Sequence, residues 1–274
     1  MKKDKLITSI DNPLIKQIKR LKQKKYRYKE GYFLAEGERL VSDLLPTGLI
    51  KTVLIAASKK LPEDCFLSSQ EQREETAFQM VKVDDRVFKE VTDTVHNQGI
   101  LALIAMPSYR LDELGQEDGL YLVLDRVQDP GNLGTIIRTA VAADVKAVLL
   151  VKGTVDLYNE KTIRSTMSGI GKLPVITDLT EEKLIKWKEE KGLKAYATSL
   201  SQALPYKEVT YANKSLLIMG NEGQGVSRKL LAIADQKIQI PMYGPIESLN
   251  VSVASALCMF AIQERWHEYE QKNR

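Results

Sequence analysis

Three loops beyond residue 120 hold the polar side chains whose types and spacing could do chemistry. In the first, residues 125–138 (DRVQDPGNLGTIIR), a Pro-Gly turn leads into a helix whose free amide groups could hold an anion. Asn132 could do no more than cap this helix. That interpretation leaves Arg138 unexplained, because this arginine lies among apolar residues a turn into the helix.

The second loop, residues 219–226 (MGNEGQGV), has three glycines in the order G-x-x-G-x-G. A dinucleotide-binding fingerprint has the opposite order, so these glycines argue against a nicotinamide dehydrogenase. Glycines also serve turns, and on their own they are weak grounds for a ligand site. Glu222 is the additional feature, since a carboxylate in a tight loop after a buried strand usually accepts several hydrogen bonds.

The third segment, residues 240–253 (IPMYGPIESLNVSV), combines a rigid loop with the start of the last helix. Two prolines and a glycine restrict the loop, and Ser248, Leu249 and Asn250 then open the helix. Ser248 or Asn250 could act only as a helix cap. Taken one at a time, each of the three loops is explained better by structure than by chemistry.

Alternating strands and helices are expected to hold these loops in place. The predicted strands of this part are 120–124, 147–151, 173–176, 195–198, 216–219 and 237–240. The predicted helices are 134–143, 162–168, 181–191, 227–234 and 251–271. This alternation predicts an α/β fold with a mostly parallel sheet covered on both faces. Ligands bind beyond the carboxyl ends of such strands, so we expect the site in the loops after residues 124, 219 and 240.

A change of composition at residues 107–119 predicts a domain boundary. This stretch (PSYRLDELGQEDG) is polar and contains proline, glycine and four acidic residues. We therefore expect one domain at 1–107, a linker at 108–119 and a second domain at 120–274. In the first domain we expect a helix from Pro13, a second helix over about 35–45, and strands at 52–57, 81–83 and 100–105.

The first 29 residues are strongly basic. They hold eleven Lys and Arg against two Asp, a formal charge of +9 in a chain whose total is +4. A concentrated basic arm predicts contact with a polyanion, and nearby aromatic rings could stack on unpaired bases. The alternative is a solvated, lysine-rich helix face. The candidate RNA contacts are Lys16, Lys19, Arg20, Lys24, Lys25 and Arg27, with Tyr26, Tyr28, Tyr32 and Phe33 as candidate stacking rings.

The remaining composition argues against several other classes of protein. Cys65 and Cys258 lie far apart, and with only His96 and His267 in the chain no zinc site can be assembled. The same scarcity of histidine disfavours Ser-His-Asp and Cys-His hydrolases. No apolar run approaches the ~18 residues of a membrane span, and no signal-peptide core follows the basic N-terminus. We therefore expect a cytoplasmic protein with no metal and no membrane contact.

Taken together, the three loops resemble the signature motifs of the SpoU/TrmH branch of the SPOUT methyltransferases. They stand here as DPGNLGTIIRTA (129–140), IMGNEGQGVS (218–227) and IPMYGPIESLNVSVASAL (240–257). Upstream, FLAEGERLVSDLL (33–45) and HNQGILALI (96–104) resemble the ribosomal-protein-like substrate-binding domain that is fused to many members. The most similar members are the large-subunit rRNA 2′-O-methyltransferases.

The resemblance implies a fold, a reaction and an assembly. The fold is an α/β methyltransferase domain whose C-terminal segment forms a trefoil knot, preceded by a small α/β domain. The reaction moves a methyl group from S-adenosylmethionine to a ribose 2′-hydroxyl, here expected in large-subunit rRNA and on a guanosine. A tRNA 2′-O-methyltransferase and a non-catalytic RNA-binding ribosome-assembly factor on the same fold are the alternatives. Family members are homodimers, often with a site shared between subunits.

The resemblance also implies roles for single residues. The family pattern assigns catalysis to Asn132, Arg138, Glu222, Ser248 and Asn250. It assigns cofactor contacts to Thr198, Gly220, Asn221, Ile240, Met242, Leu249 and Asn250. A guanidinium is a poor base at neutral pH, so we expect Arg138 to bind the adjacent phosphate and to stabilise developing alkoxide charge.

Overall fold

The computed structural model describes residues 6–61, 78–92 and 97–272, and the chain folds into two units. One unit comprises Met1–Pro107 together with Tyr158–Gly171, and the other comprises Ser108–Leu157 together with Lys172–Arg274. Residues 158–171 fall within the second domain that the sequence predicts, whereas in the structure this segment packs within the first unit. Cys65 and His96 lie outside the described residues.

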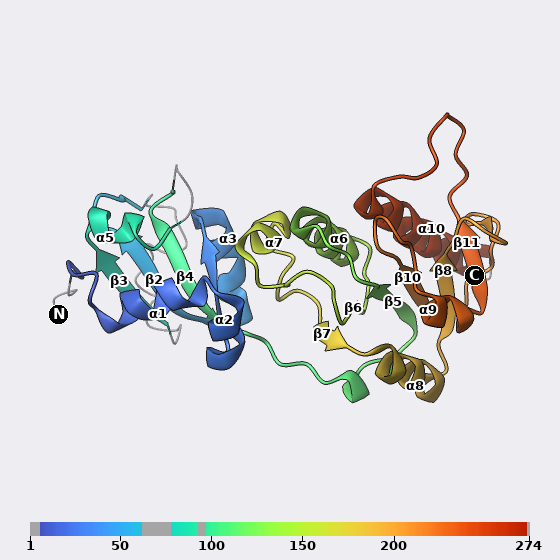
Figure 1. Ribbon diagram of the computed structural model, residues 1–274, viewed down its shortest axis with the longest axis horizontal. Helices are drawn as coiled ribbons and strands as arrows, with labels where there is room; N and C mark the ends of the chain where they lie inside the picture. The colour runs from blue at the N-terminus through green and yellow to red at the C-terminus, as the bar shows by residue number, and fades with distance from the viewer. Residues whose placement is uncertain (1–5, 62–77, 93–96, 273–274) are drawn as a thin grey trace. The chain divides into compact units, whose positions relative to one another are not determined.

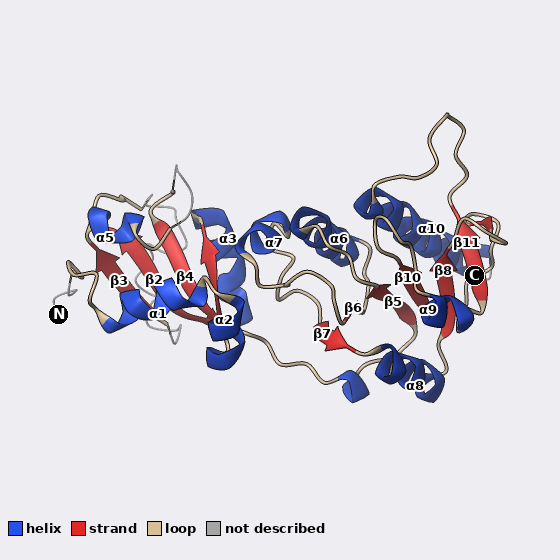
Figure 2. Ribbon diagram, in the orientation of Figure 1, coloured by secondary structure: helices blue, strands red, loops and turns tan. Residues whose placement is uncertain are grey.

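The first unit is built on a four-stranded sheet with strand order β1-β4-β2-β3. The strands are β1 (Tyr32–Glu36), β2 (Ile50–Ala56), β3 (Gln79–Val83) and β4 (Ile100–Ala105). The helices are α1 (Pro13–Leu21), α2 (Lys24–Glu30), α3 (Glu38–Leu44), η1 (Leu45–Thr47), α5 (Asp85–Lys89) and α7 (Glu160–Ser165). The pair β2–β3 is parallel, and β4 pairs antiparallel with both β1 and β2. Helices surround this sheet (Figure 2).

The predicted helix from Pro13 is confirmed. The side chain of Asn12 accepts a hydrogen bond from the amide of Leu14 at 2.9 Å, and Pro13 occupies the first turn, where its missing amide costs nothing. Ile15, Ile18 and Leu21 recur on one face and are buried against the sheet.

The predicted helix over 35–45 is wrong in its first part. Residues 32–36 form the edge strand β1, in which Phe33 pairs with Ile104 of β4, and the helix α3 begins only at Glu38. Gly37 separates the two elements with a φ of +109°, a conformation that favours glycine. Phe33 is buried, so it is unavailable as a stacking ring for RNA.

The second unit contains a seven-stranded sheet with strand order β7-β6-β5-β10-β8-β11-β9 (Figure 1). The strands are β5 (Gly119–Leu124), β6 (Ala147–Val151), β7 (Val175–Leu179), β8 (Lys194–Thr198), β9 (Leu204–Pro205), β10 (Lys214–Met219) and β11 (Gln236–Gln239). The helices are η2 (Leu111–Glu113), α6 (Pro130–Ala142), α8 (Glu181–Lys191), α9 (Arg228–Ala232) and α10 (Val251–Lys272). Every strand pair of this sheet is parallel, which confirms the predicted α/β architecture.

The strand order places the predicted loops at one edge of this sheet. Strands β6 and β7, which follow β5 in the sequence, extend the sheet on one side of β5. The later strand β10 pairs with β5 on its other side. The order of the strands therefore reverses at β5, and the carboxyl ends of β5, β10, β8 and β11 all face the same edge. A ligand crevice is expected at such a switch point. Within the described residues, no helix is both long and apolar enough to span a membrane.

Candidate active site

Glu222 joins the loops that follow β5 and β10. One of its carboxylate oxygens, Oε2, accepts a hydrogen bond from the backbone amide of Gln128 at 3.2 Å. The other, Oε1, accepts from Nδ2 of Asn132 at 3.1 Å and from the amide of Asp129 at 3.4 Å. The carboxylate therefore fixes both the start of α6 and the side chain of Asn132.

Asn250 adds the third loop to this arrangement. Its Nδ2 donates to Oδ1 of Asn132 at 2.9 Å, while its own Oδ1 accepts from the amide and the hydroxyl of Ser252 at 2.8 and 2.6 Å. The carboxamide of Asn132 is thus held at both ends. We call the chain Glu222–Asn132–Asn250 the polar triad. It contains three of the five residues that were predicted to be catalytic, and each comes from a different loop.

Asn132 is free to join the polar triad because it does not cap α6. The capping residue is Asp129, whose Oδ1 accepts from the amide of Asn132 at 2.8 Å, and Pro130 follows in the first turn. The alternative interpretation of Asn132 as a simple helix cap is therefore wrong. Asn250 combines both roles, since its side chain caps α10 through Ser252 and also contacts Asn132.

The hydrogen bonds around Glu222 also set its charge. Desolvation opposes ionisation, but the hydrogen bonds from Asn132 and from backbone amides, including those of Gln128 and Asp129, lower the pKa of Glu222 below its ordinary value. The carboxylate is consequently ionised at neutral pH. A group in this state is suited to orienting Asn132 and not to exchanging a proton near pH 7.

A tight loop after β10 presents Glu222. The backbones of Asn221 and Gly225 form a pair of hydrogen bonds at 3.0 and 2.9 Å, and Oδ1 of Asn221 also accepts from the amide of Gly223 at 2.9 Å. A Cβ at Gly220 would lie 2.1 Å from the carbonyl carbon of Gly225, so only glycine fits at position 220. The loop therefore requires glycine at position 220 for space and favours it at position 225, where φ is +67°.

Arg138 and Ser248 do not join the polar triad. Arg138 lies on α6 and Ser248 precedes α10, and both side chains are exposed. In the described part of the chain neither side chain makes a hydrogen bond or an ion pair. The structure thus brings together three of the five predicted catalytic residues and leaves these two open to solvent.

The predicted cofactor contacts lie at the carboxyl ends of three adjacent strands. Thr198 ends β8, Gly220 follows β10 and Ile240 follows β11. Figure 1 shows the segment between β11 and α10, which contains Met242 and Leu249, projecting from the rest of this unit. Within the described residues, the backbone amides of Ile240, Met242 and Leu249 donate no hydrogen bond to the protein. Unused backbone groups of this kind fit a cofactor that is bound through the main chain.

One pair of residues that supports the site, Asp125 and Arg126, is not among the predicted site residues. Asp125 is fully buried, and its carboxylate accepts from Nε of Arg126 at 2.8 Å and from the amide of Ser227 at 2.7 Å. The carbonyl of Arg126 accepts from Nδ2 of Asn221 at 2.8 Å, and Arg126 itself has a φ of +59°. The available signal was an Asp-Arg pair directly after the apolar strand LYLVL.

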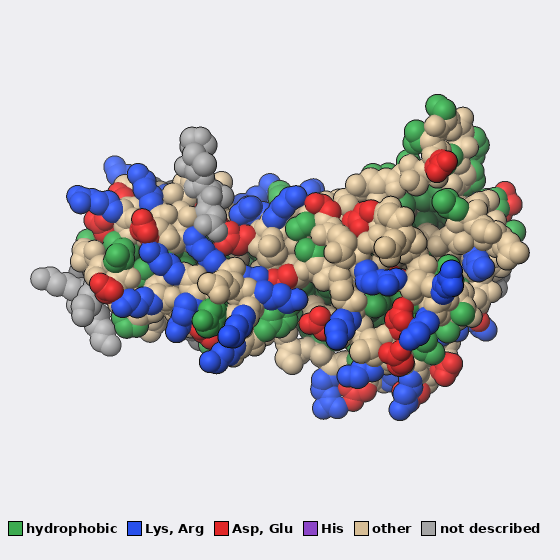
Figure 3. Space-filling model, viewed as in Figure 1, with side chains coloured by type: hydrophobic (Ala, Val, Ile, Leu, Met, Phe, Trp, Pro, Cys, Tyr) green, Lys and Arg blue, Asp and Glu red, His purple; other side chains and the backbone are tan. Residues whose placement is uncertain are grey.

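The described part of the basic arm, residues 6–29, is largely exposed, and Figure 3 shows Lys and Arg side chains gathered over α1 and α2. The ion pairs in this arm are partly or fully open to water, as between Lys19 and Glu90 at 2.9 Å. Lys24 lies over the ring of Tyr28 at 5.3 Å from its centroid, and Lys25 over the ring of Tyr26 at 5.9 Å.

Arg27 is the exception among the predicted RNA contacts. Its side chain is buried, and Nη1 donates to the carbonyls of Leu21 and Lys22 at 2.8 and 2.7 Å. These carbonyls lie at the end of α1, where backbone carbonyls have no partner within the helix itself. The prediction that Arg27 contacts RNA is therefore wrong, because its guanidinium is used inside the protein.

The sequence matches two families along most of its length. Residues 119–260 match the SpoU rRNA Methylase family, and residues 12–102 match the MRM3-like substrate binding domain. The first match spans just over half of the chain and includes all three loops of the candidate site. The chain belongs to the SpoU rRNA methylase family. The resemblance that the three motifs carried is thereby confirmed.

Relatives and solved structures match the enzyme over nearly its full length. The 23S rRNA (guanosine(2553)-2′-O)-methyltransferase RlmP of Bacillus subtilis is 38% identical over 94% of this chain and 99% of RlmP. The AdoMet-bound rRNA methyltransferase from Sinorhizobium meliloti is 32% identical and superposes with a TM-score of 0.85, covering 95% of this chain and 97% of that one. AviRb from Streptomyces viridochromogenes, at 23% identity and a TM-score of 0.82 over 93% of this chain and 98% of that one, shares the fold.

These matches confirm the predicted enzyme class and fold. The enzyme is an RNA 2′-O-methyltransferase with a mixed α/β fold and a parallel seven-stranded sheet. The trefoil knot stays a prediction from the resemblance.

Proposed function

We propose that the enzyme methylates a ribose 2′-hydroxyl of large-subunit rRNA, with a guanosine as the target nucleoside and S-adenosylmethionine as the methyl donor. The observation that carries this proposal is the polar triad, which ties three loops together at the carboxyl edge of a parallel sheet. The rRNA target is supported by the relative RlmP, which is named for a guanosine of 23S rRNA and matches 94% of this chain.

S-adenosylmethionine supplies a methyl group that is already activated by the sulfonium to which it is attached. The protein therefore has to orient the reactants and to assist with one proton. We assign cofactor binding to Thr198, Gly220, Ile240 and Leu249 through backbone groups, with Asn221, Met242 and Asn250 beside them. Glu222 holds Asn132 in place as an ionised acceptor, and Asn132 and Asn250 position the ribose and the cofactor.

Arg138 and Ser248 complete the site from its exposed side. A guanidinium stays charged at neutral pH, so Arg138 is suited to binding the phosphate next to the target ribose and to stabilising charge on the attacking oxygen. Its lack of a partner within the described residues leaves the guanidinium available for that contact. Ser248 lies at the entrance to α10, two residues before Asn250 of the polar triad.

The two parts of the chain divide the work in this proposal. Residues 1–107 bind the substrate RNA, and residues 120–274 catalyse the methyl transfer. Residues 108–119 link these two domains. The match of residues 12–102 to a substrate binding domain supports this division. The RNA contacts are the exposed cations Lys16, Arg20, Lys24 and Lys25 of the basic arm, together with the half-buried Lys19. The compartment is the cytoplasm, where rRNA is assembled into ribosomes.

Two measurements test the target. We expect the purified enzyme to methylate unmodified 23S rRNA transcript, and rRNA from cells lacking the protein to lose one 2′-O-methyl group at a guanosine. Methylation of tRNA transcript alone would replace rRNA by tRNA as the substrate. Binding of RNA without methyl transfer would favour the non-catalytic assembly factor.

We also propose that the enzyme acts as a homodimer. On α10, Val253, Leu257 and Phe260 recur at helical spacing and are 48%, 38% and 43% exposed, although the opposite face of the helix is buried. An exposed apolar stripe of this kind is costly unless a second surface covers it. A second copy of the chain would cover it and could bring its own groups to the exposed side of the site.

Light scattering at micromolar concentration tests the dimer. We expect a mass of two chains for the wild type and of one chain for Phe260→Asp, because a carboxylate would be desolvated in the interface. Glu189→Gln, an exposed position on α8, is the control and should leave the dimer intact. A monomeric wild type would refute the proposal.

A further inference from the structure

The first unit contains a cavity of about 320 Å³ that belongs neither to the polar triad nor to the basic arm. Its walls come from the start of α3, the end of the loop before β4, and the turn that follows α7. The lining residues used below are Arg39, Leu40, Gln98, Arg164, Met167 and Ser168. Its volume falls at the lower end of the ~300–1,000 Å³ typical of small-ligand sites.

The turn after α7 is held in an unfavourable backbone conformation. Met167 and Ser168 have φ values of +44° and +70°, which non-glycine residues rarely adopt. Ser168 is buried, and its hydroxyl donates to Oδ2 of Asp43 on α3 at 2.6 Å. The turn is therefore fastened to α3, and it leaves Met167 48% exposed at the cavity instead of in the core. Backbone strain of this kind often marks a binding site.

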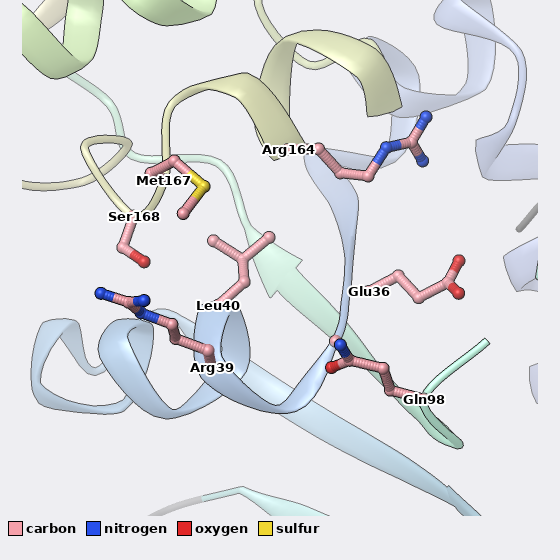
Figure 4. Close-up of a pocket in the computed structure, with 8 residues that line it drawn as sticks. Glu36, Arg39, Leu40, Gln98, Arg164, Met167 and Ser168 are labelled. Carbon is pink, nitrogen blue, oxygen red and sulfur yellow. The ribbon is translucent and has the colours of Figure 1, made fainter. Parts of the chain in front are cut away.

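The opposite wall offers a hydrogen-bond donor and an apolar floor. Oε1 of Gln98 accepts from the amide of Glu38 at 2.9 Å, which leaves the Nε2 group of Gln98 as a donor at the rim. Leu40 is almost completely buried beside it. Figure 4 shows the side chain of Met167 pointing toward Leu40 across the cavity.

Two arginines, Arg39 and Arg164, line the cavity on either side of Leu40. Arg39 is exposed and has no hydrogen-bond or ion-pair partner within the described residues. The side chain of Arg164 is 43% exposed, and its one ion pair within the described residues is a long one, 3.7 Å from Glu160. Figure 4 shows the two guanidinium groups extending to different sides of Leu40, with Arg39 on the side of Ser168.

We propose that this cavity holds one unpaired nucleotide of the RNA substrate. The base packs between Leu40 and Met167, the donor of Gln98 meets the base edge, and Arg39 and Arg164 bind the phosphates on its two sides. The apolar space between the two arginines is complementary to an uncharged base that lies between two phosphates. The methionine sulfur also packs favourably on an aromatic base. Sequence-specific RNA recognition commonly uses such unstacked bases. The inference rests on the proposed function, because it takes RNA as the substrate.

The test measures the affinity of the full-length enzyme for unmodified 23S rRNA transcript over a series of KCl concentrations. Arg39→Gln is expected to weaken binding about tenfold and to reduce the slope of log K against log salt by about 0.7, the value for one phosphate contact on a single strand. Met167→Ala is expected to weaken binding several-fold without changing that slope, because its contact is apolar. The control is Arg86→Gln, an exposed arginine on α5 outside the cavity, and it should leave both quantities unchanged.

The outcomes separate this inference from the proposed function. If the wild type fails to bind and methylate the transcript, the proposed function fails. If the wild type methylates it but Arg39→Gln and Met167→Ala bind like the wild type, only the nucleotide site is refuted, and an acidic peptide becomes the better occupant. An equal loss in Arg39→Gln and Arg86→Gln would also refute it, since the effect would then be one of general charge. Arg39 makes no hydrogen bond or ion pair within the described residues, so the melting temperature of Arg39→Gln should equal that of the wild type.

Discussion

The loops after β5 and β10 differ sharply from the exposed side of the same candidate site. The first region is held by the protein itself, through Glu222, Asn132 and the buried Asp125. On the exposed side, the side chains of Arg138 and Ser248 and the backbone amides of Ile240 and Leu249 have no partners within the described residues. We call these regions the held part and the open part.

The difference shows which groups are oriented before the reactants arrive. Preorganised groups stabilise a transition state without first having to reorganise, which suits the residues nearest the ribose and the cofactor. Groups that contact the RNA phosphate or the cofactor must instead keep their hydrogen-bonding capacity free until binding. Loss of a residue from the held part should therefore affect stability and turnover together, and loss from the open part should affect turnover and RNA affinity alone.

The largest effect is expected from Asn132→Ala in the held part. This change breaks both links of the polar triad and should lower kcat by about 100-fold, because misplaced reactive groups are costly. Single-turnover methylation of rRNA transcript measures the effect. Thr135→Ala, an exposed position on the same helix, should retain wild-type turnover. Near-normal turnover of Asn132→Ala would show that the polar triad is structural.

Asp125→Asn should have the next largest effect and should act first on stability. The carboxylate of Asp125 is fully buried against Arg126, so removal of its charge should lower the free energy of unfolding by about 2 kcal/mol. The matched control is Asp112→Asn, whose ion pair with Arg110 is exposed, so this substitution should leave the free energy of unfolding nearly unchanged. Urea denaturation measures both. Equal effects of the two substitutions would contradict a supporting role for the buried pair.

Arg138→Lys probes the open part. Lysine keeps the charge but loses the two-point contact with a phosphate, so we expect turnover and RNA affinity to fall about tenfold. The melting temperature should stay unchanged, since Arg138 has no partner within the described residues. Arg110→Lys serves as the control. If Arg138→Lys keeps most of its turnover and its RNA affinity, the assigned role of Arg138 fails.

The smallest effect concerns the charge of Glu222. Its pKa is lowered in the folded protein, so its charged hydrogen bonds contribute full stability above the unfolded pKa and lose that contribution as pH falls through the lowered value. The stability difference between wild type and Glu222→Gln should thus be constant from pH 6 to 8 and shrink below about pH 4.5. Denaturation at each pH measures it. A pH–rate profile that changes near neutrality in Glu222→Gln would instead make Glu222 a proton-transfer group.

Much of the fold and part of the site followed from short-range patterns in the sequence. The capping Asn12 and Pro13 predicted the start of α1, and alternating apolar strands predicted the parallel sheet, because both patterns report neighbours along the chain. The three loops followed from the rule that ligands bind at the carboxyl ends of parallel strands. The motifs of these loops identified the family.

The tertiary structure alone decided which side chains meet. Asn132 bonds to Glu222, 90 residues away, and to Asn250, 118 residues away, and the sequence carries no local signal for these pairs. The same holds for Arg27. Its position in a basic run predicts an exposed side chain, but in the structure its guanidinium is buried and donates hydrogen bonds to carbonyls at the end of α1. A periodic pattern shows which face of an element is apolar. Which polar groups then satisfy one another depends on how distant elements pack, so only the folded chain determines the site.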